Sequence, residues 1–380
     1  VVASANYSQA GWDYSTDFGD QFIALTKEDG ALLVGGAWNG QIKRAARVRV
    51  DSFGSATCKA AGDCYKRSQE SCDDGKPCTV DACDVKTGKC TNKAAVEGAG
   101  CKSDGVCVKD GKCVPRKPGM VYTPGGVFWQ GCNPWLYPFP GGSPKCPALA
   151  SPQRKADVAP FWINRTEVSY DQYKDCIKAG KCGQVYENDK GCNPTNAKLN
   201  PYKDKLPVNC AKHANASDYC NWLGGRLPTE AEWEKAARGG CELLPDGANC
   251  QKKMPTFPWG EGLGGPCQKW SATSVCGKLG AMQLAGSAPL DRSPYGLLDM
   301  GGNLAEWLAE AGPPEVGDYA KAYSPKIKEC SNAKCNYKRR GAYYGTDKAS
   351  QTSSHHRDVG APKQQNHYLA TGIRCVVPAP

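Results

Sequence analysis

The chain has 380 residues, with 44 Gly, 27 Pro and 23 Cys, and a formal net charge of +10. No apolar run approaches the roughly 18 residues that a membrane-spanning helix needs. The 48 Lys and Arg are dispersed, without the basic stripe and interleaved aromatics of a nucleic-acid groove. The sequence therefore predicts a loop-rich protein of two or three domains, with no transmembrane segment and no nucleic-acid partner.

The cysteines predict disulfides and an oxidising compartment, so we expect a secreted, extracellular or cell-surface protein. They occur in short-range pairs, dense only between Cys58 and Cys113, and no C-x2-C metal knuckle is present. Because the count is odd, at least one thiol is free, pairs with another chain or has lost its partner to processing. The start at Val1 is expected to be a processed terminus or the start of a fragment.

Composition divides the chain into segments 1–57, 58–115 and 116–380. The first holds no cysteine, and its apolar runs flank turn signals such as Lys27-Glu28-Asp29-Gly30. This pattern predicts β-strands similar to one blade of a β-propeller. A single blade cannot bury its faces alone, so we expect it to pack on the rest of the chain, a longer precursor or a neighbouring subunit.

Residues 58–115 predict a cysteine-rich module. The run CDDGKPCTVDACD at 72–84 resembles the short cysteine repeat of slime-mould extracellular matrix proteins. So small a module has little apolar core, and we expect its disulfides to hold it together.

The third segment predicts a strand over 161–168 and three helices. The first and third helices begin with a hydroxyl residue followed three positions later by Gln or Glu, which is a capping box, and both end at glycine. The three helices are expected at about 170–179, Ala214–Leu223 and 230–238, with caps at Ser169 and Thr229.

Several motifs of this segment occur in the order of one known family. They are EVSxxxY at 167–173, YCNW at 219–222, GRLPTEAEWE at 225–234, FPWG at 257–260, YGLLDMGGNLAEW at 295–307, RGAY at 340–343 and GIRC at 372–375. The segment thereby resembles the formylglycine-generating enzymes, or sulfatase-modifying factors. The resemblance implies an α+β, C-type-lectin-like fold with small twisted sheets, few helices and much ordered loop.

The loop from Asp299 to Trp307 suits a cation. By resemblance, the ligands are the side chains of Asp299 and Glu306 with the main-chain carbonyls of Gly302 and Leu304, all oxygen donors as Ca²⁺ prefers. We expect structural calcium that crosslinks a loop without a core, and no copper. The alternative is that the two carboxylates accept hydrogen bonds from loop amides.

The resemblance also implies a disulfide between Cys220 and Cys375, a long closure that contributes on the order of 4 kcal/mol. Separation in the sequence suggests four local pairs: Cys132 with Cys146, Cys241 with Cys250, Cys267 with Cys276, and Cys330 with Cys335. The sequence assigns no partners among Cys176, Cys182, Cys192 and Cys210.

The family's catalytic pair is missing. Active members hold Cu(I) with two thiolates five residues apart, just after a strand of the Arg340-Gly341 type, and oxidise a substrate cysteine to formylglycine. The corresponding positions here are Gly345 and Ser350, and neither can hold Cu(I). The resemblance therefore carries the fold without the redox centre.

Polar and aromatic residues stand where the active site would be. They include Tyr343, Tyr344, Asp347, Ser350, His355, His356 and His367. Stiff tyrosines with adaptable hydrogen-bonding groups suit recognition of a partner, and a solvated loop is the alternative.

Together these features favour a non-catalytic structural or binding protein outside the cell. Its family domain would be a rigid head that binds a protein or glycan ligand, or that assembles with other copies into a filament or layer. The alternative is a divergent oxidase or peptide-tailoring enzyme of the same family that uses another metal site.

Overall fold

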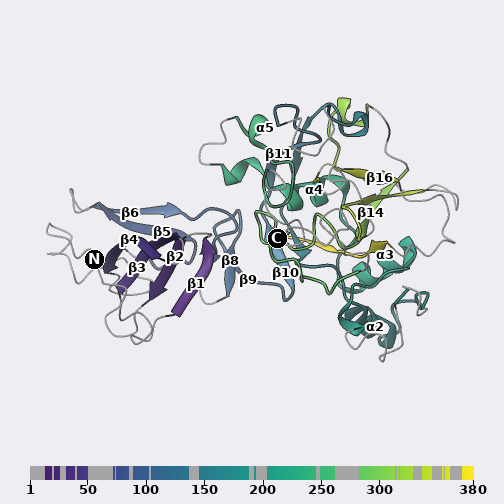
Figure 1. Ribbon diagram of the computed structural model, residues 1–380, viewed down its shortest axis with the longest axis horizontal. Helices are drawn as coiled ribbons and strands as arrows, with labels where there is room; N and C mark the ends of the chain where they lie inside the picture. The colour runs from purple at the N-terminus through teal and green to yellow at the C-terminus, as the bar shows by residue number, and fades with distance from the viewer. Residues whose placement is uncertain are drawn as a thin grey trace. The chain divides into compact units, whose positions relative to one another are not determined.

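The computed structural model describes residues 72, 74–84, 89–101, 104–136, 145–187, 192–193, 203–244, 249–261, 282–312, 315, 317–327, 336–344, 353–354, 356–359 and 370–380. It also gives the backbone of four strands before position 50. The chain divides into two compact units, Val1–Val114 and Pro115–Pro380 (Figure 1). The division lies beside the change of composition at 115, and segments 1–57 and 58–115 both fall in the first unit.

The first unit begins with one antiparallel sheet in which each strand pairs with the next. Its strands are β1 (Asp13–Phe18), β2 (Gln21–Leu25), β3 (Ala31–Trp38) and β4 (Gln41–Arg49). The turn signal at 27–30 lies between β2 and β3, as the sequence predicts.

The cysteine-rich module follows as a hairpin and a small three-stranded sheet. The strands are β5 (Thr79–Asp84) with β6 (Lys89–Ala94), and β7 (Gly100–Cys101), β8 (Gly105–Cys107) and β9 (Cys113–Pro115). In the described part of the module, the disulfides are Cys72–Cys90, Cys78–Cys107 and Cys101–Cys113. Buried sulfur makes up much of its interior, as expected of a module with so few large apolar side chains.

Three small sheets organise the second unit. The first has the order β10 (Met120–Thr123), β13 (Phe161–Asn164), β18 (Val376–Pro378), and the second pairs β11 (Gly126–Gln130) with β12 (Arg154–Val158). The third has the order β16 (Arg357–Val359), β15 (Tyr337–Arg340), β14 (Ala305–Ala311), β17 (Thr371–Gly372). Only the β14–β17 pair is parallel among these ladders.

The predicted helices are present and short. They are α2 (Tyr170–Lys178), α3 (His213–Trp222) and α4 (Glu230–Arg238), followed by the one-turn α5 (Cys250–Lys253). Single 3-10 turns are η2 (Ala148–Ala150), η3 (Lys203–Lys205), η4 (Cys241–Leu243) and η7 (Asp318–Ala320). Both capping boxes form, at Ser169 with Gln172 and at Thr229 with Glu232.

The core of the second unit consists of two clusters of buried side chains. The first surrounds Trp233 on α4, a helix that contacts β11, β12, β14 and β15. The other surrounds Tyr173 and Tyr219, whose rings stack with centroids 5.6 Å apart, and includes Trp307. Helix α4 is buried along its whole length, so its charged residues need internal partners.

Disulfides staple the loops between these elements. Cys220–Cys375 lies in the second core cluster, and the other bonds are Cys132–Cys146, Cys176–Cys182, Cys192–Cys210 and Cys241–Cys250. The pairs among Cys176, Cys182, Cys192 and Cys210 are thereby assigned. The pairs Cys267–Cys276 and Cys330–Cys335 lie outside the described residues.

The predicted strand over 161–168 is too long, because β13 ends at Asn164. From there the main chain leaves the ladder, and Arg165 N donates to Gly119 O while Val168 N donates to Ile373 O. The turn delivers the Glu167 carboxylate to a buried site near β14, which a continuing strand could not do.

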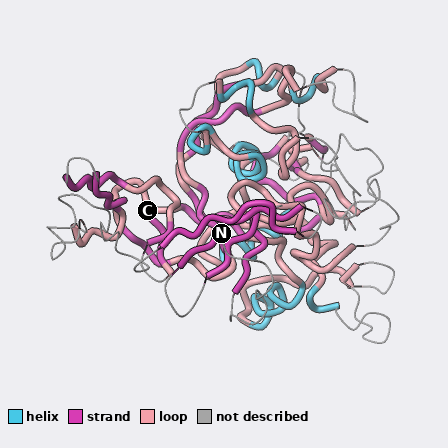
Figure 2. Tube along the Cα trace, turned by 60° about the vertical axis from the view of Figure 1, so that its left-hand side comes forward, coloured by secondary structure: helices cyan, strands magenta, loops and turns pink. Residues whose placement is uncertain are grey.

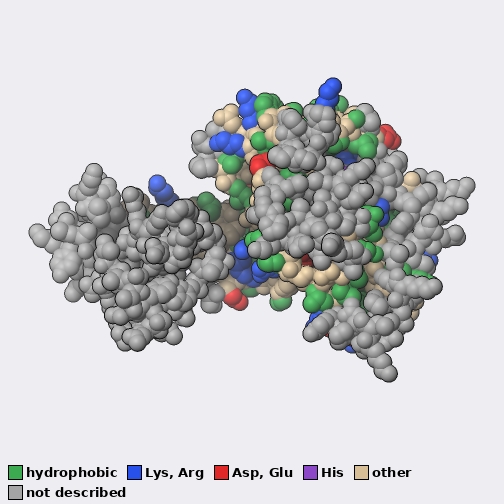
Figure 3. Space-filling model, in the orientation of Figure 1, with side chains coloured by type: hydrophobic (Ala, Val, Ile, Leu, Met, Phe, Trp, Pro, Cys, Tyr) green, Lys and Arg blue, Asp and Glu red, His purple; other side chains and the backbone are tan. Residues whose placement is uncertain are grey.

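Loops make up much of the trace (Figure 2). No helix in the described part of the chain is long and apolar enough to cross a membrane. Among the residues that Figure 3 colours, Lys and Arg side chains stand in several separate groups.

Candidate functional site

The segment that follows β15 is where the family would place its thiols. It begins at Gly341, whose φ is +70°; a Cβ there would lie 3.3 Å from Trp233 Cζ2. Glycine is needed at this turn because other residues strain at such angles. Tyr344 N then donates to Asn303 O at 2.8 Å, which ties the segment to the predicted cation loop.

The structure describes three members of the predicted binding surface. The rings of Tyr343 and Tyr344 meet edge to face with centroids 5.9 Å apart, and both residues are half-buried. Burial raises the pKa of the Tyr344 hydroxyl, which therefore stays protonated. His356 is also half-buried. The catalytic positions Gly345 and Ser350, together with Asp347, His355 and His367, lie outside the described residues.

Arg340 anchors this segment from below. Its side chain is fully buried and its Nη2 donates to Glu234 Oε2 at 2.7 Å and to the Tyr319 hydroxyl at 2.6 Å. Its Nη1 donates to the main-chain oxygens of Ser354 and His356 at 2.9 and 3.3 Å. One guanidinium therefore links α4, η7 and the return of the chain toward β16.

A second buried ion pair lies beside the first. Arg357 donates to both oxygens of Glu230 at 2.6 and 3.0 Å, and Lys338 Nζ lies 3.1 Å from Glu230 Oε2. Burial opposes ionisation of Glu230, but Arg340, Arg357 and Lys338 hold the pKa of its carboxyl far below the usual range. The neighbouring Glu310 differs, because burial and the charge of Glu230 raise its pKa to about 7. These paired charges hold the buried residues next to the segment that follows β15 in fixed positions.

Four carboxylates gather on the other side, around the loop from Asp299 to Glu306. They belong to Glu167, Asp291, Asp299 and Glu306, and each residue is at most 2% exposed. Arg374 is ion-paired to Glu306, its Nε lying 2.8 and 3.0 Å from the two oxygens. Burial raises the pKa of all four carboxyl groups.

Main-chain amides donate to several of these oxygens. Glu167 accepts from Leu304 N and from Asn303 Nδ2, each at 3.1 Å, and Asp291 accepts from Gly301 N through both oxygens at 3.0 Å. Asp299, at φ +61°, accepts from Gly286 N through Oδ2. Its Oδ1 is buried and has no amide donor, and the Glu167 carboxyl, whose pKa burial raises well above its usual range, is placed to share a proton with the Asp299 carboxyl. A buried carboxylate oxygen without a donor is costly and points to a missing cation or proton.

The four predicted calcium ligands differ in how well they fit. Asp299 offers Oδ1, which has no amide donor, while both oxygens of Glu306 already accept hydrogen bonds, from Arg374 and from Trp233 Nε1 at 2.5 Å. Gly302 and Leu304 add main-chain carbonyls on the same loop. The donor set is oxygen throughout, which fits calcium with Asp299 as its side-chain ligand and Glu306 held in an ion pair.

Side chains of the types that bind metals come closest together elsewhere in the described part of the protein. Across the described ranges, three ligand atoms of such side chains lie within 4.8 Å of one another only at Cys78, Cys101 and Cys107. These sulfurs are in the disulfides Cys78–Cys107 and Cys101–Cys113 and hold no metal in that state. Calcium at Asp299 would therefore depend on main-chain oxygens and water.

Several residues of the site are not singled out by any pattern in the sequence. Glu167, Asp291 and Arg374 are buried against the cation loop, and Glu230 and Glu234 carry the ion pairs under Arg340. Glu167 and Arg374 stand inside recognised motifs, EVS and GIRC, but a motif does not say that a charge is buried. The charges of α4 could have been suspected from their place in a helix enclosed by strands.

The sequence is similar to known proteins of one family. The sulfatase-modifying factor enzyme 1-like domain matches residues 108–379. A formylglycine-generating enzyme of Thermomonospora curvata is 28% identical over 236 residues, which are 50% of this chain and 71% of that enzyme. The mouse protein called inactive C-alpha-formylglycine-generating enzyme 2 is 35% identical over 121 residues, 30% of this chain and 36% of that protein.

Among solved structures, that of CarF superposes with a TM-score of 0.46 and 21% identity, covering 69% of this chain and 98% of CarF. The predicted class, α+β with few helices and much loop, is confirmed. Through residues 108–379, the chain belongs to the sulfatase-modifying factor enzyme 1-like domain family.

Proposed function

We propose that this protein is a non-catalytic structural or binding protein that works outside the reducing cytosol. The proposal rests on the positions and the bonding of the cysteine residues. Gly345 and Ser350 stand at the positions of the catalytic thiols. Every cysteine side chain that the structure describes lies in a disulfide. Copper oxidation in this family needs a free pair of thiolates.

The surroundings of the lost pair support a binding role. The Arg340 ion-pair network gives the segment a rigid base, and Tyr343 and Tyr344 stand on it half-buried. Amphipathic rings with one polar end suit contact with a protein or glycan. The mouse relative called inactive is a precedent for a member of this family without the activity.

The test is an oxidation assay with Cu(I), oxygen and a cysteine peptide, with formylglycine read by mass spectrometry. We expect none from this chain, while the Thermomonospora curvata enzyme serves as the positive control. The variant Gly345→Cys/Ser350→Cys restores the two thiols, and we expect it to bind one Cu(I) where the native chain binds none. Formylglycine produced by the native chain, or stoichiometric copper or iron in the purified protein, would favour the divergent oxidase.

We further propose that Ca²⁺ occupies the loop at Asp299. Two observations support it. Four carboxylates are buried together, and the Arg374 guanidinium is ion-paired to one of them, Glu306. The Oδ1 atom of Asp299 is buried without an amide donor. Asp299 would hold the ion, with the carbonyls of Gly302 and Leu304, and the ion would crosslink the loop and offset its negative charge.

Removing this ion should destabilise the protein. We expect chelation to lower the Tm by several degrees, and Ca²⁺ to restore it, because a ligand that binds the folded state alone stabilises that state. Asp299→Asn should abolish the response to Ca²⁺, and Asp318→Asn, outside the loop, should preserve it. The site would be refuted if the protein purifies without calcium and its Tm changes with neither the chelator nor Ca²⁺.

Location outside the cytosol and self-assembly complete the proposal. The disulfides suit an oxidising compartment, and the odd cysteine count supports a link to another chain. A species that is larger on a gel without reductant than with it would identify such a link.

A further inference from the structure

Trp135 is exposed just after a short segment, Gly131 to Asn133, that buried contacts hold in place. Its side chain is 49% exposed, although the buried residues Cys132 and Asn133 lie only two and three positions before it. A large apolar ring left in solvent is informative when the structure around it is rigid, because the ring is then held in place for contact.

Asn133 sets the position of Trp135. The Asn133 side chain is fully buried, and its Oδ1 accepts from Trp135 N at 3.1 Å. Its Nδ2 donates to the main-chain oxygens of Lys252 and Met254, both at 2.9 Å. The loop that carries Trp135 is thereby fastened to α5.

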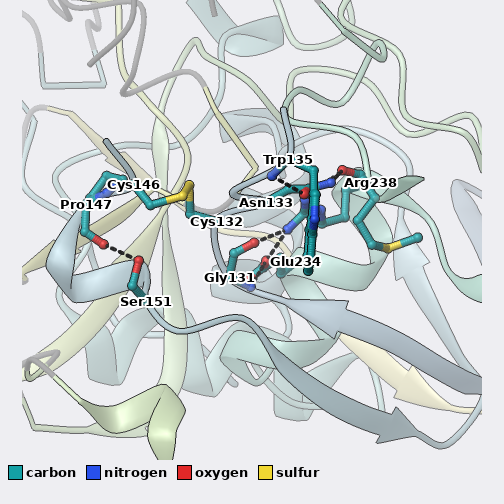
Figure 4. Close-up of a disulfide and its surroundings, with 10 residues drawn as sticks. Gly131, Cys132, Asn133, Trp135, Cys146, Pro147, Ser151, Glu234 and Arg238 are labelled. Carbon is teal, nitrogen blue, oxygen red and sulfur yellow. Dashed lines mark hydrogen bonds and ion pairs between the residues drawn. A yellow bond between two sulfur atoms is a disulfide. The ribbon is translucent and has the colours of Figure 1, made fainter. Parts of the chain in front are cut away.

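Covalent bonds and a buried ion pair brace both partners (Figure 4). Cys132 is joined to Cys146, and α5 is joined to η4 by Cys241–Cys250. Between them, Arg238 donates to Gly131 O, to Met254 O and to Glu234 Oε1, with the last distance 2.8 Å. In Figure 4 the disulfide lies on one side of Gly131, and Asn133, Arg238 and Glu234 lie on the other.

One positive charge stands beside the ring, and a second follows it in α5. Lys252 and Lys253 are both exposed, and Lys252 Nζ lies 5.8 Å from the centroid of the Trp135 ring. At this distance an ammonium is attracted to the indole face. The surface therefore combines a flat apolar ring and two cations, on a support that loses little entropy when it binds.

We propose that Trp135, Lys252 and Lys253 form a binding site for acidic polysaccharide. The apolar face of a sugar ring stacks on the indole, and its carboxylate or sulfate pairs with the lysines. The net charge of +10 attracts such a polymer from a distance. The inference goes beyond the proposed function and does not depend on it, because an active oxidase could carry the same surface.

The test measures binding of the full chain to three polysaccharides at low and physiological salt. The probes are heparin for sulfate, polygalacturonate for carboxylate, and dextran as the neutral control. We expect binding to one or both acidic polymers, weakened by salt, and none to dextran. Trp135→Ala should weaken it by about tenfold, Trp135→Tyr should retain part of it, and Lys252→Ala/Lys253→Ala should remove most of its salt dependence.

Matched variants separate this site from general attraction between charges. Trp222→Ala removes a tryptophan that is 38% exposed, and Lys178→Ala/Lys181→Ala removes two exposed lysines at the end of α2. Both should bind like the native chain. The site is refuted if these variants weaken binding as much as the Trp135 and Lys252 variants, if dextran binds as tightly, or if polyglutamate replaces the polysaccharides without loss. Thermal unfolding shows that each variant is folded.

Discussion

His213 shows how one buried residue contributes to stability without belonging to the site. Its ring stacks on Tyr337, with centroids 3.4 Å apart, and meets the edge of Trp307. Its Nε2 lies 2.9 Å from Leu308 O, which places a proton there. Burial lowers the pKa of His213 to about 4, so the imidazole stays neutral in the folded protein.

This shift makes stability depend on pH with a definite sign. Between about pH 6.5 and 4 the unfolded chain binds a proton at His213 and the folded protein does not. The contribution is complete above pH 6.5 and falls as the pH approaches 4. We expect the native chain to lose on the order of 2 kcal/mol more than His213→Gln over this range, measured by urea unfolding at each pH. Parallel pH curves for the two proteins would contradict the assignment.

Single residues were predictable from the sequence only where a motif names them. Asp299 and Glu306 stand in the motif at 295–307, and Tyr344 directly follows the motif at 340–343; its main-chain nitrogen donates to Asn303 O of the first motif. The ion pair between Glu306 and Arg374 could not be predicted from the sequence. The two residues are far apart in the chain, and the parallel pairing of β14 with β17 brings them together.

Among the elements, helix α4 begins at a capping box formed by Thr229 and Glu232. Thr229 Oγ1 accepts from Glu232 N at 3.2 Å, and Thr229 N donates to Glu232 Oε2 at 2.8 Å. The same carboxylate accepts from both terminal nitrogens of Arg226 at 2.6 and 2.7 Å. One capping box therefore starts the helix and ties it to the preceding loop.

Loss of this cap should destabilise the whole second unit. We expect Thr229→Ala to lower the free energy of unfolding by about 1 kcal/mol, because a helix amide loses its acceptor. Thr229→Ser keeps the hydroxyl and should stay close to the native value. Denaturant unfolding with an unchanged slope would show that stability alone has changed, and equal effects of the two substitutions would argue against capping.

Helix ends were predictable because caps and glycines act within a few residues. Strand ends were not, as β13 shows. It stops at Asn164, where Asn164 Oδ1 accepts from Cys375 N, a residue more than two hundred positions later in the chain. Contacts of such sequence separation leave no local pattern.

At the scale of the molecule, disulfides and ion pairs take the place of long ladders. Cys220–Cys375 closes a loop with a sequence separation of 155, whereas Cys176–Cys182 closes one of 6. The loop-entropy argument gives the longer bond the larger effect on the unfolded chain. The long pair was predictable from the family resemblance, because its two cysteines stand in recognised motifs.

Removing the two bonds should have unequal consequences. We expect Cys220→Ala/Cys375→Ala to lower the free energy of unfolding by about 4–5 kcal/mol, and Cys176→Ala/Cys182→Ala by about 2 kcal/mol. Both substitutions remove one disulfide, so they control for each other in the same unfolding experiment. A larger loss from the shorter loop would show that packing around the sulfurs outweighs the entropy of the unfolded chain.

Strand β18 has a consequence for how the protein is made. It completes the sheet of β10 and β13, and Cys375 beside it supplies the partner of Cys220. A ribosome synthesises these residues after almost everything else in the domain. Until they emerge, β13 keeps an open edge, exposed to pairing with other nascent chains. We therefore expect this unit to complete its folding only after these residues have been synthesised. A chain truncated before Cys375 would lack both the third strand of this sheet and the disulfide to Cys220.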